Sequence, residues 1–243
     1  GVLAYVCSHI LAYDVQVHQG VLQVCTGGAG TYGMRLGLMP EPFEYFHLVQ
    51  GAIDAAGLRY QVLDTDGVAR EGLRWPEPAL EEVALAPFDP AHPPAAPEPG
   101  GSWVAHVRLT GTAPACDREQ TLVCGWDTHE GPESPWIGLT PGNRLAVQLV
   151  PHAGHGAQWW QGPALTHGEP FDIEVGIHSG LGPGGVLWRA PSGTWSSLKT
   201  TAARGAEGLD WPAAWAVGHG QSGPADRPFQ ASDLCVSFAL TTL

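Results

Sequence analysis

The feature that most constrains the fold of this chain is a stretch of dense proline between residues 86 and 101. Its six prolines are Pro87, Pro90, Pro93, Pro94, Pro97 and Pro99. Proline fixes φ and lacks an amide hydrogen, so this density excludes a helix and interrupts sheet hydrogen bonding. An extended, semi-rigid linker is expected instead. We therefore predict a division near residue 95, with one part at 1–85, the linker at 86–101 and a second part at 102–243.

Both flanking parts show the pattern of short β-strands. The chain has 33 glycines and 22 prolines, a composition that favours turns over helices. Alternating or continuous apolar runs predict strands, of which the clearest are 14–17, 21–25, 45–53, 58–63, 103–109, 145–149, 171–178, 185–188 and 234–240. In the longest alternating run, Phe171, Ile173, Val175 and Ile177 fall on one face. The chain is therefore predicted to be mainly β, with a two-sheet sandwich in its second part.

Charge, hydropathy and cysteine content narrow the function classes. The net charge is −13, from 24 acidic and 11 basic residues, which disfavours nucleic acids and anionic membranes as partners. No apolar run reaches the roughly 18 residues of a membrane span. Of the five cysteines, Cys116 and Cys124 could close a small loop, whereas Cys7 and Cys25 lie in runs typical of buried thiols. Scarce lysine, ten tryptophans and the cysteine content favour a secreted or periplasmic protein.

In the first part, a strand ending in Ser8-His9-Ile10-Leu11 is followed by a hairpin through Gly20 to Val24, the Gly-rich turn Thr26 to Gly30, and two strands that end in Asp64-Thr65-Asp66-Gly67. Through these segments, roughly residues 1–72 resemble the closing section of calcineurin-like metallophosphoesterases. The resemblance implies that residues 1–85 form a partial metallophosphoesterase-type β-sandwich segment. It also implies that His9 is a metal ligand, the alternative being a hydrogen-bonded histidine packed at a strand end.

This part departs from the family where most metal ligands would stand. The family's second histidine falls at position 11, which is Leu11 here, and Ser8 replaces the glycine before the first histidine. The Asp-x-His, Gly-Asp and Gly-Asn-His motifs come earlier in such proteins. A two-metal site needs several ligands for each ion. We therefore expect a divalent metal pair only if the missing N-terminal half of the core is supplied, for example as a separate partner chain, and no cofactor otherwise.

In the second part, the segments that carry a further resemblance are 165–175, 185–188, 209–211, 215–218 and 229–236. Through them the second part resembles laminin-G-like domains with the concanavalin-type jelly roll. The resemblance implies an antiparallel jelly-roll sandwich at 102–243 that binds glycans or proteins. The same sandwich also carries glycan-cleaving enzymes, so the fold alone does not choose between binding and catalysis.

The most site-like cluster of the second part is His152-Ala153-Gly154-His155 with Trp159 and Trp160. Indole rings can stack on sugar rings, and nearby imidazoles can donate hydrogen bonds to hydroxyl groups. Gly154 opposes the helix that a His-Glu-x-x-His metal site needs. We therefore predict a glycan-binding site at His152, His155, Trp159 and Trp160, the alternative being a loop whose tryptophans cover an edge of the sandwich.

Three weaker patterns bear on catalysis or ligand binding. Asp172 and Glu174 share one strand face, as the two carboxylates of a glycanase would, but a pair of solvent-exposed acids is the favoured interpretation. The turn 26–30 could cradle a phosphate, yet no helix pattern follows it, and a structural turn is favoured. Asp64 to Gly67 looks like half a calcium loop, whereas a type I turn is the simpler interpretation.

These patterns predict a fragment of a secreted, metal-dependent phosphoesterase-like hydrolase with a glycan- or surface-binding jelly-roll module. The chain as given is not expected to be catalytically complete. The alternative is a non-catalytic binding or structural assembly protein, followed by a glycan-cleaving sandwich enzyme. An assembly protein would present unpaired strand edges at residues 1–6.

Overall fold

A computed structural model shows the arrangement of the chain. It describes residues 1–8, 13–27, 47–98, 101–126, 133–150, 156–200, 206, 209, 211–220, 228–231 and 233–243. Three predicted site residues, His9, His152 and His155, lie outside the described residues. None of the described helices is long and apolar enough to cross a membrane.

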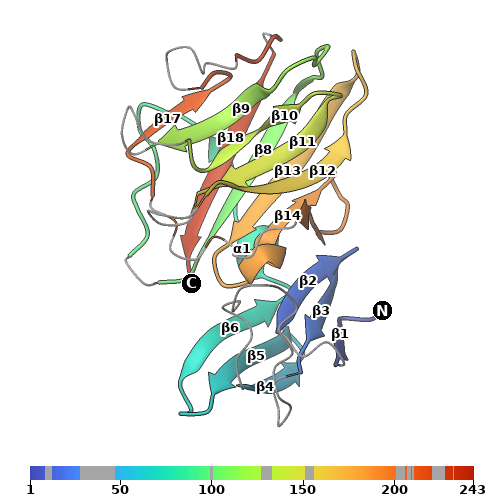
Figure 1. Cartoon of the computed structure of the whole chain (residues 1–243), viewed down its shortest axis with the longest axis vertical. Coiled ribbons are helices and arrows are strands. Elements are labelled where there is room, and N and C mark those ends of the chain that lie inside the picture. Colours follow the sequence, from blue (N-terminus) through green and yellow to red (C-terminus); the bar gives the residue numbers. More distant parts are fainter. Residues whose placement is uncertain are drawn as a thin grey trace.

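The second part of the chain forms a sandwich of two six-stranded antiparallel sheets, which occupies the upper part of Figure 1. The first, which we call the β10 sheet, runs in the order β16-β12-β11-β10-β9-β17. Its strands are β9 (Gln120–Trp126), β10 (Trp136–Thr140), β11 (Arg144–Leu149), β12 (Gln158–Ala164), β16 (Lys199–Thr200) and β17 (Ala214–Val217). The predicted mainly β fold with an antiparallel sandwich is therefore confirmed.

The other sheet, the β8 sheet, runs in the order β15-β14-β13-β8-β18-β7. Its strands are β7 (Ala86–Pro87), β8 (Trp103–Thr112), β13 (Pro170–His178), β14 (Val186–Arg189), β15 (Ser196–Ser197) and β18 (Cys235–Thr242), and a 3-10 helix, η1 (Gly182–Gly185), precedes β14. Strand β7 lies within the proline-rich stretch and pairs with β18. The linker at 86–101 and the boundary near residue 95 stay predictions.

The space between the two sheets holds the larger hydrophobic core, because alternate side chains of a strand point to opposite faces. Strand β13 contributes Phe171, Ile173, Val175 and Ile177 to it, as their spacing predicts. Strand β11 contributes Leu145, Val147 and Leu149 from the opposite sheet. The adjacent residues on both strands, such as Glu174 and Gln148, therefore point away from this core, to the outer faces of the sandwich.

The first part of the chain forms two three-stranded sheets, drawn below the sandwich in Figure 1. In the β3 sheet, β1 (Ala4–Cys7) pairs parallel with β3 (Val21–Cys25), which forms the predicted hairpin with β2 (Asp14–His18). The β5 sheet is the meander β4 (His47–Asp54), β5 (Gly57–Asp64) and β6 (Ala69–Trp75). These sheets support no assignment to a metallophosphoesterase core.

The turn between β5 and β6 is an ordinary one. The Asp64 carboxylate accepts hydrogen bonds from the backbone N–H groups of Asp66 and Val68 at 3.0 and 2.9 Å. Gly67 has a φ of +76°, which favours glycine. The simpler interpretation of residues 64–67 as a turn is confirmed.

A second hydrophobic core joins the two parts of the chain. It contains residues of both three-stranded sheets, such as Val15 and Val62, together with Val104 and Trp195 from the outer side of the β8 sheet. Helix α1 (Pro78–Glu81) lies at this junction and contributes its fully buried Leu80. The three-stranded sheets therefore cover part of the outer face of the β8 sheet.

All five cysteines are free thiols. The loop closure between Cys116 and Cys124, which the sequence left open, does not form. The Cys116 thiol instead contacts the carbonyl oxygen of Thr140 at 3.2 Å, and burial raises its pKa. Cys25 is buried as predicted, whereas Cys7 is only half-buried.

Candidate functional site

The outer face of the β10 sheet carries an apolar cluster that includes three tryptophans. Cys124, Trp136, Ala146 and Ala216 are buried there, and the half-buried Trp126 and Trp159 pack against them. We call these six residues the Trp136 cluster. Its members come from β9, β10, β11, β12 and β17, so the cluster crosses most of the sheet. On the outer side of the β8 sheet, Trp75 and Trp195 are buried in the core that this sheet shares with the three-stranded sheets.

Two interactions fix the Trp136 ring against the sheet. Its Nε1–H donates to Thr121 Oγ1 at 2.8 Å. The ring also lies over Gly138, where a Cβ atom would overlap it, so glycine provides the room that the indole needs. Trp136 is 0% exposed although it lies on an outer face. A rigid ring of this kind can support a neighbouring ring that contacts a ligand.

Trp159 is that neighbouring ring. Its centroid lies 5.5 Å from the Trp136 centroid with an interplanar angle of 66°, an edge-to-face contact. Such contacts are favourable by about 0.5–1.5 kcal/mol beyond the buried area. The Trp159 side chain remains half-buried. It therefore combines a fixed position with a partly accessible indole surface.

Gln148 lies on β11, the strand between those that carry the two rings. Gln148 pairs in register with Trp136 on one side and with Trp159 on the other. Its Nε2 donates to the backbone oxygen of Glu133 at 2.9 Å, and the Ser134 hydroxyl accepts from the backbone N–H of Val150 at 2.9 Å. These bonds tie the segment before β10 to the end of β11. Gln148 and Ser134 are themselves buried, so the exposed polar group beside Trp159 is Gln161, two residues along β12. Apolar ring surface next to a polar side chain is the combination found in binding sites for small polar ligands.

The structure separates the two tryptophans that the sequence predicted to act together. Trp159 lies in the Trp136 cluster, whereas Trp160 is 0% exposed in the core between the sheets. Trp160 is therefore a core residue, and only Trp159 is available to a ligand. The described residues contain no group of three or more histidine, cysteine or acidic side chains that could hold a metal ion.

Asp172 and Glu174 lie on the outer face of the β8 sheet and are engaged in ion pairs. Asp172 pairs with Arg108 at 2.6 Å, and its side chain is 32% exposed. Glu174 pairs with Arg189 at 2.7 Å and with His106 at 3.0 Å, and its side chain is only 11% exposed. The expectation of a solvent-exposed pair is thus wrong for Glu174.

Helix α1 covers this group of charges. The Arg189 guanidinium donates to Glu81 as well as to Glu174, and it lies 4.4 Å from the centroid of the Trp195 ring. Burial lowers the pKa of His106, although the contacts with Glu174 act in the opposite direction. Each carboxylate has a cationic or imidazole partner, so this group holds the two parts of the chain together and offers no free acid and base.

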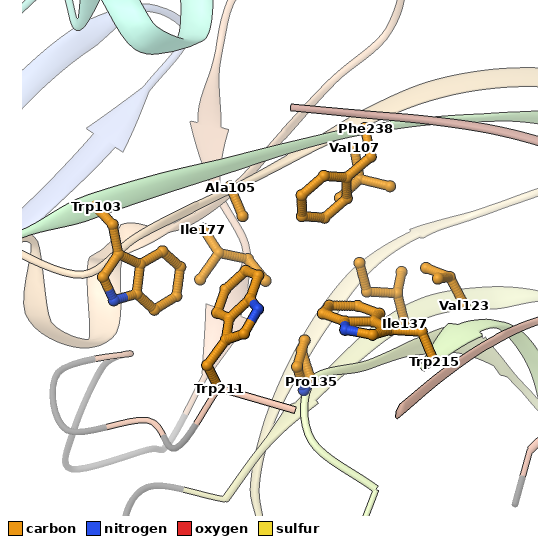
Figure 2. Close-up of a pocket in the computed structure, with 10 residues that line it drawn as sticks. All are labelled: Trp103, Ala105, Val107, Val123, Pro135, Ile137, Ile177, Trp211, Trp215 and Phe238. Atoms are coloured by element: carbon orange, nitrogen blue, oxygen red, sulfur yellow. The ribbon is translucent and has the colours of Figure 1, made fainter. Parts of the chain in front are cut away.

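A small cavity lies between the two sheets, where Figure 2 shows Trp103, Trp211, Trp215 and Phe238 gathered around it. Their rings contact one another edge-on or tilted, with centroids 5.5 to 6.4 Å apart. The cavity volume is about 10 Å³. A single water molecule needs roughly 10–15 Å³ on this measure, so the cavity is a gap in an aromatic core and not a ligand pocket.

Sequence reasoning missed Trp136 and Trp126 as members of the site. The available signal was local: Trp136 and Gly138 alternate with Ile137 and Leu139, so they face away from the core. The position of Trp136 beside Trp159 depends on the register of three strands, which the sequence does not show. Two residues of the predicted turn, Thr26 and Gly27, are described, and the Thr26 hydroxyl bonds to His47 Nε2 at 2.8 Å.

Comparison with known proteins leaves the family open. No protein-family model matches the sequence, and no curated protein matches it. Among solved structures, the binding domain of botulinum neurotoxin DC in complex with rat synaptotagmin II is 9% identical over 96% of this chain and 46% of that chain, with a TM-score of 0.36. The bacteriophage CBA120 tailspike protein 2 enzymatically active domain is 9% identical over 98% of this chain and 36% of its own, with a TM-score of 0.37.

A third similar structure is the polysaccharide lyase family 18 protein aly-SJ02, 9% identical over 59% of this chain and 74% of its own, with a TM-score of 0.31. The chain spans less than half the length of the first structures it resembles, at 41% to 47%. With TM-scores below 0.5, these likenesses carry no argument about function. The functional conclusion therefore rests on the geometry of the chain itself.

Proposed function

We propose that this chain is a non-catalytic binding module that holds a carbohydrate on the outer face of its β10 sheet. The observation that carries the proposal is the half-buried Trp159 ring, which the buried Trp136 supports edge-on. A flat indole offers apolar surface to the C–H face of a sugar ring. The exposed side chain of Gln161, two residues from Trp159 on the same strand face, offers an amide for hydrogen bonds to hydroxyl groups.

The composition of the β10 sheet favours binding over glycan cleavage. Glycosidases generally use two carboxyl groups that flank the scissile bond. None of the six strands of the β10 sheet contains an aspartate or glutamate. The carboxylates of Asp172 and Glu174 belong to the other sheet and are ion-paired. A binding surface on the β10 sheet needs no such pair.

Several features of the sequence interpretation stay predictions. They are the laminin-G-like kinship, secretion or export to the periplasm, the contribution of His152 and His155 to the glycan site, and the metal pair with His9 and a partner chain. A phosphoesterase has no support among the described residues, which hold no candidate metal site. The binding module is the function that the described residues support best.

The proposal is tested by measuring glycan binding of the purified chain on a glycan array, followed by calorimetric titration of the best ligand. We expect Trp159→Ala to weaken binding about tenfold, since loss of a stacking ring costs about 1–1.5 kcal/mol. Trp159→Phe should recover part of the affinity because it keeps an aromatic face.

Tyr5→Ala is the matched control, because it removes an exposed ring from β1, on the other part of the chain. Circular dichroism should show that all three variants remain folded. Wild-type affinity in Trp159→Ala, or equal losses in Trp159→Ala and Tyr5→Ala, would contradict the proposed site. Absence of binding to any glycan would contradict the proposed function.

A further inference from the structure

We propose that the carbohydrate bound on the β10 sheet is anionic, and that Arg144 and Lys199 contact its carboxylate or sulfate groups while Trp159 stacks on a sugar ring. This inference rests on the proposed function and names the ligand class of the same face. It follows from where the few cations of this acidic chain lie.

Arg144 begins β11 and points to the outer face. Its neighbour Leu145 is fully buried in the core between the sheets, and alternation therefore places Arg144 on the opposite side. Arg144 is exposed, and its Nη1 donates to the backbone oxygen of Gly162 on β12 at 3.0 Å. That bond holds the guanidinium beside β12, the strand that carries Trp159, and leaves other N–H groups for a ligand. A guanidinium can bind carboxylate or sulfate through two parallel hydrogen bonds.

Lys199 reaches the same face from the edge strand β16. Its neighbour Leu198 is buried in the core, and Lys199 itself is exposed. It pairs in register with Gln161, which lies two residues from Trp159 and is also exposed. Side chains two residues apart on a strand share a face. Lys199, Gln161 and Trp159 therefore form one continuous surface.

Both cations lie beyond Trp159 toward the C-terminal end of β12, where Lys199 pairs with Gln161 and Arg144 pairs with Ala164. Arg144 and Lys199 are separated by β12, which corresponds to roughly 12 Å between their backbones from strand spacing and rise. Among the described residues neither forms an ion pair with an acidic side chain, in contrast to Arg59, Arg108 and Arg189. Two cations without acidic partners on one sheet face are suited to bind separate acid groups along an extended chain.

The position of Arg144 and Lys199 on one sheet face is informative because the chain as a whole is acidic. Acidic residues outnumber basic ones by 24 to 11, and Lys199 is the only lysine. Even so, the strands of the β10 sheet contain two cations and no acid. The Debye length is about 8 Å at physiological ionic strength, so distant negative charge is largely screened there. The local sign of this face, and not the net charge, then determines which ligand it accepts.

The experiment compares anionic and neutral polymers of matched backbone: polygalacturonate with its fully methyl-esterified form, and dextran sulfate with dextran. We expect the wild-type chain to bind one or both anionic polymers at least tenfold more tightly than the neutral partner. The two pairs distinguish a carboxylate from a sulfate ligand. Arg144→Gln/Lys199→Gln should reduce anionic binding roughly tenfold, the sum of two exposed ion pairs. Arg74→Gln, which removes an exposed cation from β6, should leave it unchanged.

The single lysine allows a second measurement. Amine-reactive labelling followed by peptide mass spectrometry reads Lys199 separately from the N-terminal amine, and a bound anionic polymer should slow its labelling several-fold. A Trp159-dependent affinity that is equal for neutral and anionic polymers would overturn this inference and leave the proposed function standing. Equal losses in Arg74→Gln and in the double variant would overturn it as well. If the chain binds neither kind of polymer and no arrayed glycan, both this inference and the proposed function are overturned.

Discussion

Replacing Glu174 with glutamine tests whether the charges beneath α1 hold the two parts of the chain together. Glutamine keeps the size of the side chain and removes its charge. The Arg189 guanidinium, whose side chain is 15% exposed, would keep Glu81 as its only acidic partner among the described residues. His106 would lose its charged partner as well. The variant therefore leaves a largely buried cation with reduced compensation.

The expected loss in the free energy of unfolding follows from the burial of the Arg189–Glu174 ion pair. Breaking a buried ion pair by removing one partner costs about 3–5 kcal/mol. Because Arg189 retains the half-exposed Glu81, we expect a loss below this range, about 2 kcal/mol. Asp172→Asn is the matched control, since Asp172 lies two residues away on the same face and pairs with Arg108. Their side chains are 32% and 44% exposed, so breaking this pair should cost less than about 1 kcal/mol.

Urea denaturation at pH 7.5, followed by tryptophan fluorescence, measures both variants. With an m value of about 2 kcal/mol per molar urea, the midpoint of Glu174→Gln should fall by about 1 M and that of Asp172→Asn by less than 0.5 M. A midpoint for Glu174→Gln that is no lower than the control would refute the reasoning, because the buried ion pairs would then contribute no more than exposed ones.

Three further outcomes are expected. As the pH is lowered from 7 to 5, the free energy of unfolding should decrease by at most about 1.4 kcal/mol per pH unit. Burial holds the pKa of His106 below its usual 6.5, so the unfolded chain takes the proton first. His106→Asn should flatten this slope in urea titrations, and an unchanged slope would count against the prediction. Gly176→Ala should destabilise the chain by about 1–2 kcal/mol in the same assay, since the new Cβ would lie 2.7 Å from a buried leucine of α1; wild-type stability would show that α1 adjusts freely. Exposed Cys235 should react with a maleimide in the native state, whereas Cys124 should react only after unfolding; equal rates would contradict this burial.

The sequence alone predicts the strands in which apolar and polar side chains alternate regularly. In β13, Phe171 and Ile177 reach the core because a period of two fixes which face each residue occupies. The same period explains the difference between Trp159 and Trp160. Adjacent residues on a strand point to opposite faces, so one ring had to enter the core, and only the paired strands determine which one.

Features that depend on contacts between distant segments could not be predicted from the sequence. Glu174 is buried because Arg189 binds it together with Glu81, which is 108 positions from Arg189 along the chain. Trp136 lies between Cys124 and Gln148 of the neighbouring strands and packs in one cluster with Trp126 and Trp159. Both depend on which strands become neighbours, and local apolar patterns carry no information on that order.

The hydrophobic core shared by the two parts has a consequence for engineering. A designer who excised the sandwich at the proline-rich stretch, to graft its β10 sheet onto another protein, would uncover Val104, Leu187 and Trp195 on the opposite sheet. These side chains would form an exposed hydrophobic patch on the transplanted fragment, and such a patch promotes aggregation. A usable graft would need polar replacements at these positions, or it would have to include residues 1–85 as the native cover.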